Sequence, residues 1–216
     1  MTSRDQLVHA AFELFGARGF NQTTVDDIAA HAGVSRATFF RLFASKEAVI
    51  FPDHDALLAK VEATLAAGEP GMAPAALFEA ARLVLRHYLA EGERARQRYA
   101  LTRDTPALRD AEIAIQRRYQ QLFRNQLRLW LIAEGRPDDI RAEVIANAVV
   151  VIHNHVLRSW LRSEPGDPED RLRTAIISTV DRLHGDAADP SSTQIVLLRT
   201  TKSIGDLLPQ LQALLS

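Results

Sequence analysis

Apolar residues recur every three or four positions through most of the chain, which is the spacing of an amphipathic α-helix. In the N-terminal third, this pattern predicts helices at about residues 4–17, 25–32, 36–42 and 46–67, the last with a kink at Pro52 and a fresh helix start at Asp53 and Asp55. Glycine, proline and turn residues then separate five more helices, at about residues 75–90, 94–103, 106–134, 137–162 and 168–184. A last amphipathic helix is predicted at about 204–215, and the short apolar run 195–198 fits a strand or a helix. The pattern therefore predicts an all-α fold.

Residues 23–47 predict two short helices that are joined by a tight turn. Thr24 is a good N-cap, and Asp27, three residues later, can complete a capping box. Gly33 favours the left-handed backbone that ends a helix, and Ser35 can cap the next helix only two residues later. This arrangement is typical of a helix-turn-helix, whose second helix enters the major groove of DNA. A plain helical hairpin inside an all-α core is the alternative interpretation.

These helices resemble the DNA-binding domain of the TetR family of transcriptional regulators. The resemblance covers about residues 5–50 and rests on Thr24, Ile28, Ala29, Ala32, Gly33, Val34, Ser35, Phe39, Phe43, Lys46 and Glu47. It implies a three-helix helix-turn-helix DNA-binding domain at residues 1–50 and a larger helical ligand-binding and dimerisation domain at residues 51–216. Family members usually carry Tyr where this chain has Phe40, and a phenyl ring cannot make the phosphate contact that the tyrosine hydroxyl commonly makes.

Eight residues are predicted to form the DNA-binding surface. Arg36 and Arg41 lie on the predicted solvent side of the second helix, and arginine is well shaped to bind the paired acceptors of guanine. A phosphate contact or simple solvation is the alternative for each arginine. Hydroxyls at helix starts suit phosphate oxygens, and Lys46 resembles the family's phosphate-contacting lysine. The full set is Thr24, Ser35, Arg36, Ala37, Thr38, Phe40, Arg41 and Lys46. A small core is predicted to hold these helices, from Phe12, Phe15, Phe20, Ile28, Val34, Phe39 and Phe43.

Composition narrows the class of protein further. The 216 residues include no cysteine, which excludes disulfides and thiolate metal sites and fits a reducing cytosol. The longest apolar run, at 148–152, is too short to span a bilayer, and the acidic N-terminal stretch is not a signal peptide. We therefore expect a cytoplasmic protein without membrane contact, metal or cofactor. The net charge of −1 is compatible with DNA binding, because a helix-turn-helix needs only a few phosphate contacts per subunit.

Arginine is concentrated between residues 82 and 128. Eleven arginines and five acidic residues give this stretch a net charge of +6, against −1 for the whole chain. One interpretation is a solvated face. The other is an electropositive mouth on a ligand pocket, which would suit an anionic ligand with an apolar body such as a fatty acyl-coenzyme A. The stretch that contains FFRLF and FPDHD also resembles a TetR subgroup that includes the mycofactocin-system regulator, and this resemblance implies an acyl-coenzyme A ligand.

The predicted C-terminal helices supply candidates for a ligand pocket and a dimer interface. Pocket candidates, for each of which a core position is the alternative, are Leu58, Leu85, Tyr88, Leu89, Tyr119, Phe123, Leu127 and Trp130. The broad apolar faces of the helices at 137–162 and 168–184 are typical of a four-helix interface between two copies. The interface is predicted from Val149, Ile152, Val156, Trp160, Ile176, Val180 and Leu183. His153 and His155 point to different faces, so a buried hydrogen-bonded histidine or a pocket role is expected rather than a shared metal.

The sequence therefore predicts a dimeric transcriptional repressor that binds a palindromic operator in double-stranded DNA and is released by a small-molecule inducer. In the family, ligand binding moves the helix that follows the DNA-binding domain and changes the spacing of the two recognition helices. A constitutive or activating regulator without a ligand is the alternative. An enzyme is disfavoured, because the sequence has no glycine-rich phosphate loop, His-Glu metal spacing or nucleophile elbow.

Overall fold

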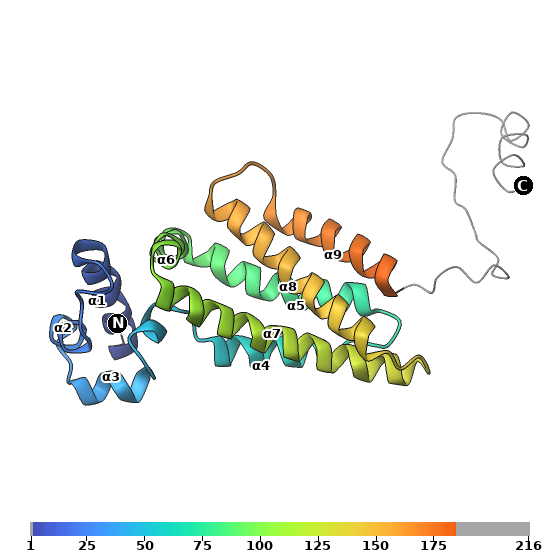
Figure 1. Cartoon of the computed structure of the whole chain (residues 1–216), viewed down its shortest axis with the longest axis horizontal. Coiled ribbons are helices and arrows are strands. Elements are labelled where there is room, and N and C mark those ends of the chain that lie inside the picture. Colours follow the sequence, from blue (N-terminus) through green and yellow to red (C-terminus); the bar gives the residue numbers. More distant parts are fainter. Residues whose placement is uncertain (1, 185–216) are drawn as a thin grey trace, which may run out of the picture. The chain divides into compact units, whose positions relative to one another are not determined.

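The computed structural model describes residues 2–184, and within them the predicted all-α fold is confirmed (Figure 1). Nine α-helices and one short 3-10 helix make up the described chain. They are α1 (Ser3–Arg18), α2 (Val25–His31), α3 (Arg36–Leu42), η1 (Glu47–Ile50), α4 (His54–Ala66), α5 (Ala73–Glu91), α6 (Glu93–Asp104), α7 (Pro106–Ala133), α8 (Asp139–Leu161) and α9 (Pro168–His184). The predictions for residues 195–198 and 204–215 lie outside the described residues.

Side-chain caps define the starts of the first three helices. Thr2 caps α1, and Thr24 caps α2 in a complete capping box with Asp27. The Ser35 hydroxyl accepts a hydrogen bond from the backbone N–H of Thr38 at 3.1 Å and caps α3. Between α2 and α3, Gly33 has a φ of 68°, a value that glycine adopts without steric cost. The caps that the sequence predicts at Thr24 and Ser35 are confirmed.

A cluster of aromatic side chains fills the space between α1, α2 and α3. Phe15, Phe20, Ile28, Phe39 and Phe43 are buried in it, and the two other predicted members, Phe12 and Val34, pack against it half-buried. This cluster also takes in side chains that the sequence did not assign to it, namely Val49, Ile50 and Phe51 around η1 and Leu108 of α7. The N-terminal helices therefore share apolar contacts with the helices that follow.

The helix predicted at residues 46–67 is two separate elements, η1 and α4, so this prediction was wrong. Pro52 disfavours the helical conformation at the preceding residue, and Phe51 accordingly takes an extended backbone with φ −83° and ψ 151°. Asp53 then begins α4 as its N-cap and accepts a hydrogen bond from the Ala56 N–H at 3.1 Å.

Helices α4 to α9 pack around a second and larger hydrophobic core. Helix α8 contacts α7 and α9, and α9 also lies against α5, as Figure 1 shows. Within the described residues, α8 is the one helix that is long and apolar enough to cross a membrane by length and composition alone. A core helix passes the same test, and α8 is largely buried between its neighbours along one side.

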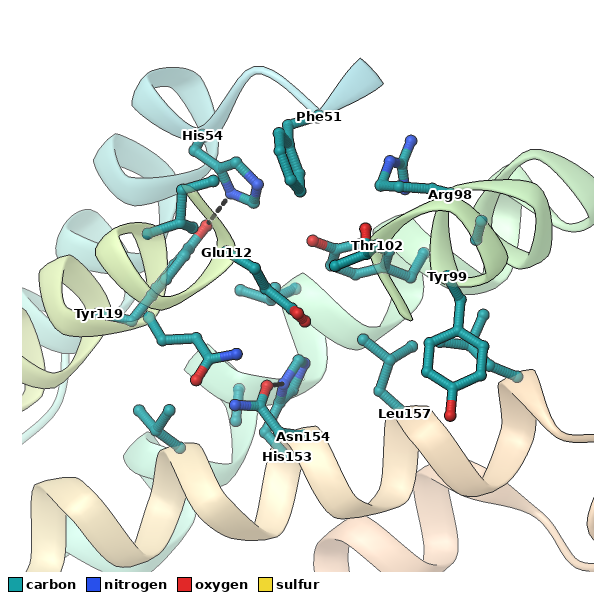
Figure 2. A pocket seen from close by; sticks show the side chains of 18 of the residues that line it. Phe51, His54, Arg98, Tyr99, Thr102, Glu112, Tyr119, His153, Asn154 and Leu157 are labelled. Carbon is teal, nitrogen blue, oxygen red and sulfur yellow. Dashed lines mark hydrogen bonds between the residues drawn. The ribbon is translucent and has the colours of Figure 1, made fainter. Parts of the chain in front are cut away.

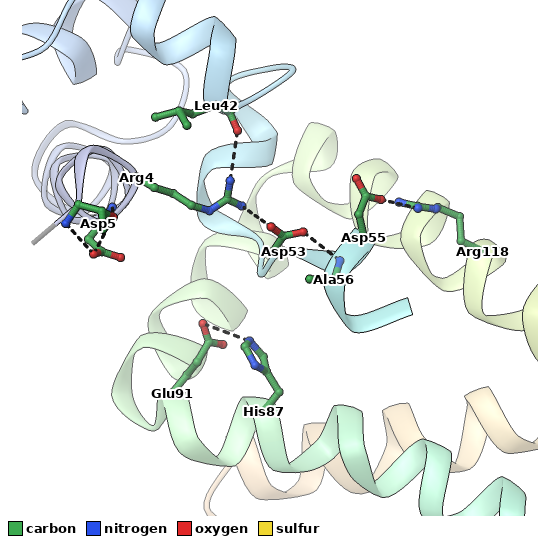
Figure 3. Close-up of polar contacts among 10 residues, drawn as sticks. Arg4, Asp5, Leu42, Asp53, Asp55, Ala56, His87, Glu91 and Arg118 are labelled. Carbon is green, nitrogen blue, oxygen red and sulfur yellow. Dashed lines mark hydrogen bonds and ion pairs between the residues drawn. The ribbon is translucent and has the colours of Figure 1, made fainter. Parts of the chain in front are cut away.

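Ion pairs hold the start of α4 from two directions (Figure 3). Arg4 of α1 donates to the Leu42 carbonyl at 3.2 Å, and its other guanidinium nitrogen lies 3.7 Å from the Asp53 carboxylate. Asp55 of α4 pairs with Arg118 of α7 at 2.5 Å. The first turn of α4 therefore connects the N-terminal helices to the C-terminal bundle.

Candidate DNA-binding surface and ligand cavity

The outer face of α3 carries four of the predicted DNA-binding residues. Arg36, Ala37, Phe40 and Arg41 are exposed, whereas Phe39 between them is fully buried and anchors the helix. The Arg36 guanidinium makes two 2.7 Å hydrogen bonds to the Asp26 carboxylate of α2 and lies 5.2 Å from the centre of the Phe40 ring. Arg36 and Asp26 are both more than half exposed, so their ion pair is weak and can exchange for a DNA contact.

The other predicted DNA-binding residues already make contacts within the chain. The Thr24, Ser35 and Thr38 hydroxyls belong to the caps of α2 and α3. The Lys46 ammonium donates to the carbonyls of Phe20 and Thr23 at 2.8 and 2.9 Å, and it lies 4.0 Å from the centre of the Phe20 ring. Lys46 therefore connects the segment after α3 to the turn before α2. One of the three N–H donors of its ammonium group is left for another partner.

A cavity lies between helices α4 to α8 and has an empty volume of about 800 Å³ when its open mouth is included. Pockets that bind small molecules commonly have a mostly apolar lining with a few polar groups. The lining follows that description: Phe51, His54, Ala81, Val84, Tyr88, Ala95, Arg98, Tyr99, Thr102, Glu112, Ile115, Gln116, Tyr119, Phe123, Val150, His153, Asn154, Leu157 and Leu161. The cavity therefore has the chemical character of a small-molecule site.

Two buried histidines form hydrogen bonds at the cavity wall (Figure 2). Nδ1 of His54 lies 3.1 Å from the Tyr119 hydroxyl, and Nδ1 of His153 lies 3.3 Å from the Asn154 side-chain oxygen. Burial lowers the pKa of both histidines to about 4, so both rings are neutral at pH 7. Burial also raises the pKa of Tyr88 to about 12 and raises the pKa of Tyr119, so both phenols stay protonated.

Arg98 of α6 joins the cavity wall to the N-terminal helices. Its Nε donates to the backbone carbonyl of Ile50, the last residue of η1. Its two terminal nitrogens bind the Glu91 carboxylate at the end of α5, at 2.7 and 2.8 Å. The Arg98 side chain is 5% exposed and that of Glu91 18%, so this bidentate pair is largely removed from water. A shift of α6 or of η1 would therefore break a desolvated contact.

Comparison with known proteins identifies the family. The family model described as "Bacterial regulatory proteins, tetR family" matches residues 7–51. The HTH-type transcriptional regulator TcmR of Streptomyces glaucescens is 33% identical over 190 residues, which span 84% of this chain and 82% of TcmR. The chain belongs to the TetR family of transcriptional regulators.

Two further comparisons agree with this family and this fold. MftR of Mycobacterium tuberculosis, a transcriptional regulator named for mycofactocin biosynthesis, is 27% identical over 85% of this chain and 93% of its own length. FadR of Bacillus subtilis, whose structure is a complex with stearoyl-CoA, aligns with a TM-score of 0.56 and 17% identity over 82% of this chain and 96% of FadR. These relatives are transcriptional regulators, which is a non-enzymatic role.

The cavity of this TetR-family regulator includes three of the eight residues predicted for it: Tyr88, Tyr119 and Phe123. The other five, Leu58, Leu85, Leu89, Leu127 and Trp130, do not line the cavity and pack in or against the larger hydrophobic core. Sequence reasoning missed most of the polar lining, including His54, Arg98 and Glu112. Both expectations for His153 match the structure, because it is buried, forms a hydrogen bond with Asn154 and lines the cavity.

The arginine-rich stretch lies mostly on the surface. Of its eleven arginines, all within the described residues, Arg98 alone lines the cavity. Others form exposed ion pairs with acids far away in the sequence, as Arg86 does with Glu169 at 2.7 Å and Arg124 with Glu143 at 3.2 Å. This distribution favours the interpretation as a solvated face. Within residues 2–184, no group of three or more histidine, aspartate or glutamate side chains could hold a metal ion.

The residues predicted for the dimer interface are largely buried within the fold of a single copy. Val149, Val156, Ile176 and Val180 are fully buried in the core that α8 and α9 share with their neighbours. Ile152, Trp160 and Leu183 are half-buried against the same core. The Arg96 guanidinium lies 4.5 Å from the centre of the Trp160 ring. Exposed apolar side chains of α8 are found elsewhere, at Ile140, Val144 and Val151.

Proposed function

We propose that this TetR-family regulator is a repressor that binds a palindromic operator as a dimer and leaves it when a small molecule occupies the cavity. In this proposal residues 1–50 form the DNA-binding domain and residues 51–216 the ligand-binding and dimerisation domain. Each copy would insert α3 into the major groove, with the two recognition helices about 34 Å apart, one turn of DNA. The complex of FadR with stearoyl-CoA supports a ligand-responsive mechanism, because FadR shares this fold.

The observation that carries the proposal is the double contact of Arg98. One side chain lines the cavity and also holds the last residue of η1, only eight residues after the end of α3. His54 adds a second connection, because it lies in the first turn of α4 and its ring lines the cavity wall (Figure 2). A ligand in the cavity would therefore contact side chains that belong to, or hold, the segment between α3 and α4.

Release from DNA then follows from a difference in ligand affinity between two conformations. A ligand shifts the equilibrium only if it binds the released conformation more tightly than the DNA-bound one. We propose that the ligand displaces α6 or the first turn of α4, and that Arg98 and the ion pair between Asp53 and Arg4 transmit this shift to α1–α3. The effect is reciprocal, so operator DNA should weaken ligand binding by the same factor.

For dimerisation we propose the outward face of α8, with a second copy of this chain as the partner. Ile140, Val144 and Val151 are 78%, 46% and 63% exposed, and their spacing of four and seven residues puts them on one stripe of the helix. Exposed apolar stripes of this kind mark interaction surfaces. Using this face leaves the buried side of α8 intact in the core of each copy.

Selection from a random double-stranded DNA library tests DNA recognition without knowledge of the operator. The proposal predicts enrichment of a palindrome whose half-sites are about 10 base pairs apart, centre to centre. Arg36→Ala and Arg41→Ala should each weaken binding to the selected DNA with no change in dimer mass. Arg173→Ala, an exposed position on α9, is the matched control and should bind normally. Wild-type affinity in both α3 variants would refute the assignment of the DNA-binding surface.

A further inference from the structure

The lining of the cavity carries information on the chemistry of its ligand. We propose that this ligand is an uncharged, flat, ring-containing molecule with at least two hydrogen-bonding groups, such as a hydroxylated polycyclic aromatic compound, and not an acyl-coenzyme A or another anion. This inference rests on the proposed function, since it names the ligand of the same cavity.

The charged groups of the lining are already paired, which disfavours an anionic ligand. Three of the five N–H donors of the Arg98 guanidinium bind Glu91 and Ile50, so its charge is already paired and an anionic ligand would have to compete with the Glu91 carboxylate. The other charged lining residue is acidic: Glu112 lies 3.7 Å from Arg158, and Figure 2 shows its carboxylate reaching into the space between the labelled side chains. An anion placed here would lose its hydration and would meet the Glu112 carboxylate, while the two nearby cations, Arg98 and Arg158, already pair with acidic side chains, so its binding would be costly.

Aromatic side chains supply the apolar surface. Five rings line the cavity and come from four different segments: Phe51, Tyr88, Tyr99, Tyr119 and Phe123. Aromatic rings pack best against other rings, in offset or edge-to-face arrangements. Such walls suit a rigid flat molecule better than a flexible acyl chain, because a rigid molecule loses little conformational freedom on binding.

Two imidazole nitrogens supply the polar recognition. Nε2 of His54 and Nε2 of His153 are buried and have no hydrogen-bond partner in the described chain. The residues are 6% and 9% exposed, and they approach the cavity from α4 and α8 respectively. Each Nδ1 is already engaged, with Tyr119 or Asn154, so each Nε2 is the free polar atom of its ring. Buried polar atoms of folded proteins are nearly always satisfied. Nε2 of His153 is an acceptor, because Nδ1 donates to the Asn154 oxygen, so a ligand hydroxyl would satisfy it. A second, suitably spaced hydroxyl or carbonyl group would satisfy Nε2 of His54.

Thermal shift and calorimetry with three probes test the ligand class. They are 1,8-dihydroxyanthraquinone, which is neutral and carries hydroxyl and carbonyl groups; anthraquinone-2-sulfonate, which has the same ring system with an anionic group; and palmitoyl-coenzyme A. We expect the neutral probe to bind at least about tenfold more tightly than either anion, the scale of one buried polar interaction. Equal or tighter binding of the sulfonate or the thioester overturns the inference, as does a failure of the neutral probe to bind.

Variants of the lining residues sharpen the test. His54→Phe and His153→Phe should each weaken binding of the neutral probe by about tenfold, while His155→Phe, an exposed position on the same helix as His153, should not. Should one buried variant fail to fold, the other carries the same comparison. Glu112→Gln should strengthen binding of the sulfonate and leave the neutral probe unchanged. Loss of binding to all probes alike in Glu112→Gln would contradict its role in excluding anions.

A gel shift on the selected operator with the same probes separates this inference from the proposed function. Release of DNA by the neutral probe alone supports both. Release by palmitoyl-coenzyme A but not by the neutral probe overturns the ligand class and leaves the ligand-responsive repressor standing. Tight binding of the neutral probe without release of DNA supports the ligand class and contradicts the proposed function.

Discussion

Replacing Arg98 with methionine removes the contact that joins the cavity to the DNA-binding helices. Methionine keeps the apolar stem but loses the guanidinium, which leaves the Glu91 carboxylate without its bidentate partner and the Ile50 carbonyl without its donor. Breaking a buried ion pair by removing one partner costs about 3–5 kcal/mol. Glu91 is 18% exposed and regains some hydration, so we expect a loss near the lower end, about 3 kcal/mol.

Urea unfolding of four proteins measures this loss. They are the wild type, Arg98→Met, Glu91→Gln and the double variant. The double variant should recover about 1–2 kcal/mol of the sum of the single losses, because it no longer leaves a buried charge unpaired. Arg103→Met is the matched control on the same helix, since Arg103 pairs with Asp104 on the surface and both side chains are about two-thirds exposed. Its midpoint of unfolding should match that of the wild type.

Operator binding is the second readout of Arg98→Met. Under conditions where the variant is folded, we expect its affinity for the selected DNA to fall about tenfold or more, because η1 and the helices before it are no longer fixed to α6. Arg103→Met should bind as the wild type does. Stability and operator affinity of Arg98→Met that both match the Arg103→Met control would refute the role that we give to Arg98.

Three further predictions follow from individual side chains. Because His54 and His153 have folded-state pKa values of about 4 against an ordinary 6.5, the unfolded chain takes up protons first as the pH falls. Urea unfolding should therefore show full stability above about pH 7 and a loss of about 2 kcal/mol per histidine between pH 7 and pH 5. His153→Phe should halve the total loss, and an unchanged loss would contradict this. Gly68→Ala should lower the free energy of unfolding by about 1–3 kcal/mol, because the added carbon would lie 2.8 Å from the β-carbon of Ala76. Gly16→Ala, in open space on α1, should raise it by about 0.5–1 kcal/mol. Thermal melts should therefore shift in opposite directions for the two variants. Asp26→Asn should tighten operator binding by about two- to threefold in fluorescence anisotropy, since it frees Arg36 and removes a negative charge beside the DNA; weaker binding would show that the ion pair positions Arg36 for DNA.

Local signals made the N-terminal part of the chain predictable. Capping by Thr24 and Ser35 depends on side-chain oxygens that reach only three residues ahead, and the structure confirms both caps. The break at Pro52 is also a local signal: the sequence predicts a kink inside one helix, with a fresh helix start at Asp53 and Asp55, and the start at Asp53 is confirmed. The extended backbone of Phe51 and the cap at Asp53 show that the proline separates two elements.

The cavity was harder to predict, because apolar periodicity does not show whether a helix face packs in the core, lines a cavity or faces solvent. Leu127 and Tyr119 both belong to the apolar pattern of α7 and to the larger core, yet only Tyr119 also lines the cavity. The same ambiguity applies to α8, where buried Val149 and exposed Val151 differ by two positions. Arg98 resembles its ten neighbouring arginines in sequence. Its partner Ile50 is 48 residues away, so only tertiary structure distinguishes it.

The central claim, that occupancy of the cavity controls DNA binding, can be tested without knowing the ligand. Gln116 of α7 is a half-buried lining residue, and Gln116→Trp would fill part of the cavity with an indole ring. Gln121→Trp, an exposed position on the same helix outside this cavity, is the control. Fluorescence anisotropy with the selected operator should show at least about tenfold weaker binding for Gln116→Trp at unchanged dimer mass and helical content, and unchanged binding for the control. Wild-type operator affinity in a folded Gln116→Trp variant would contradict the account.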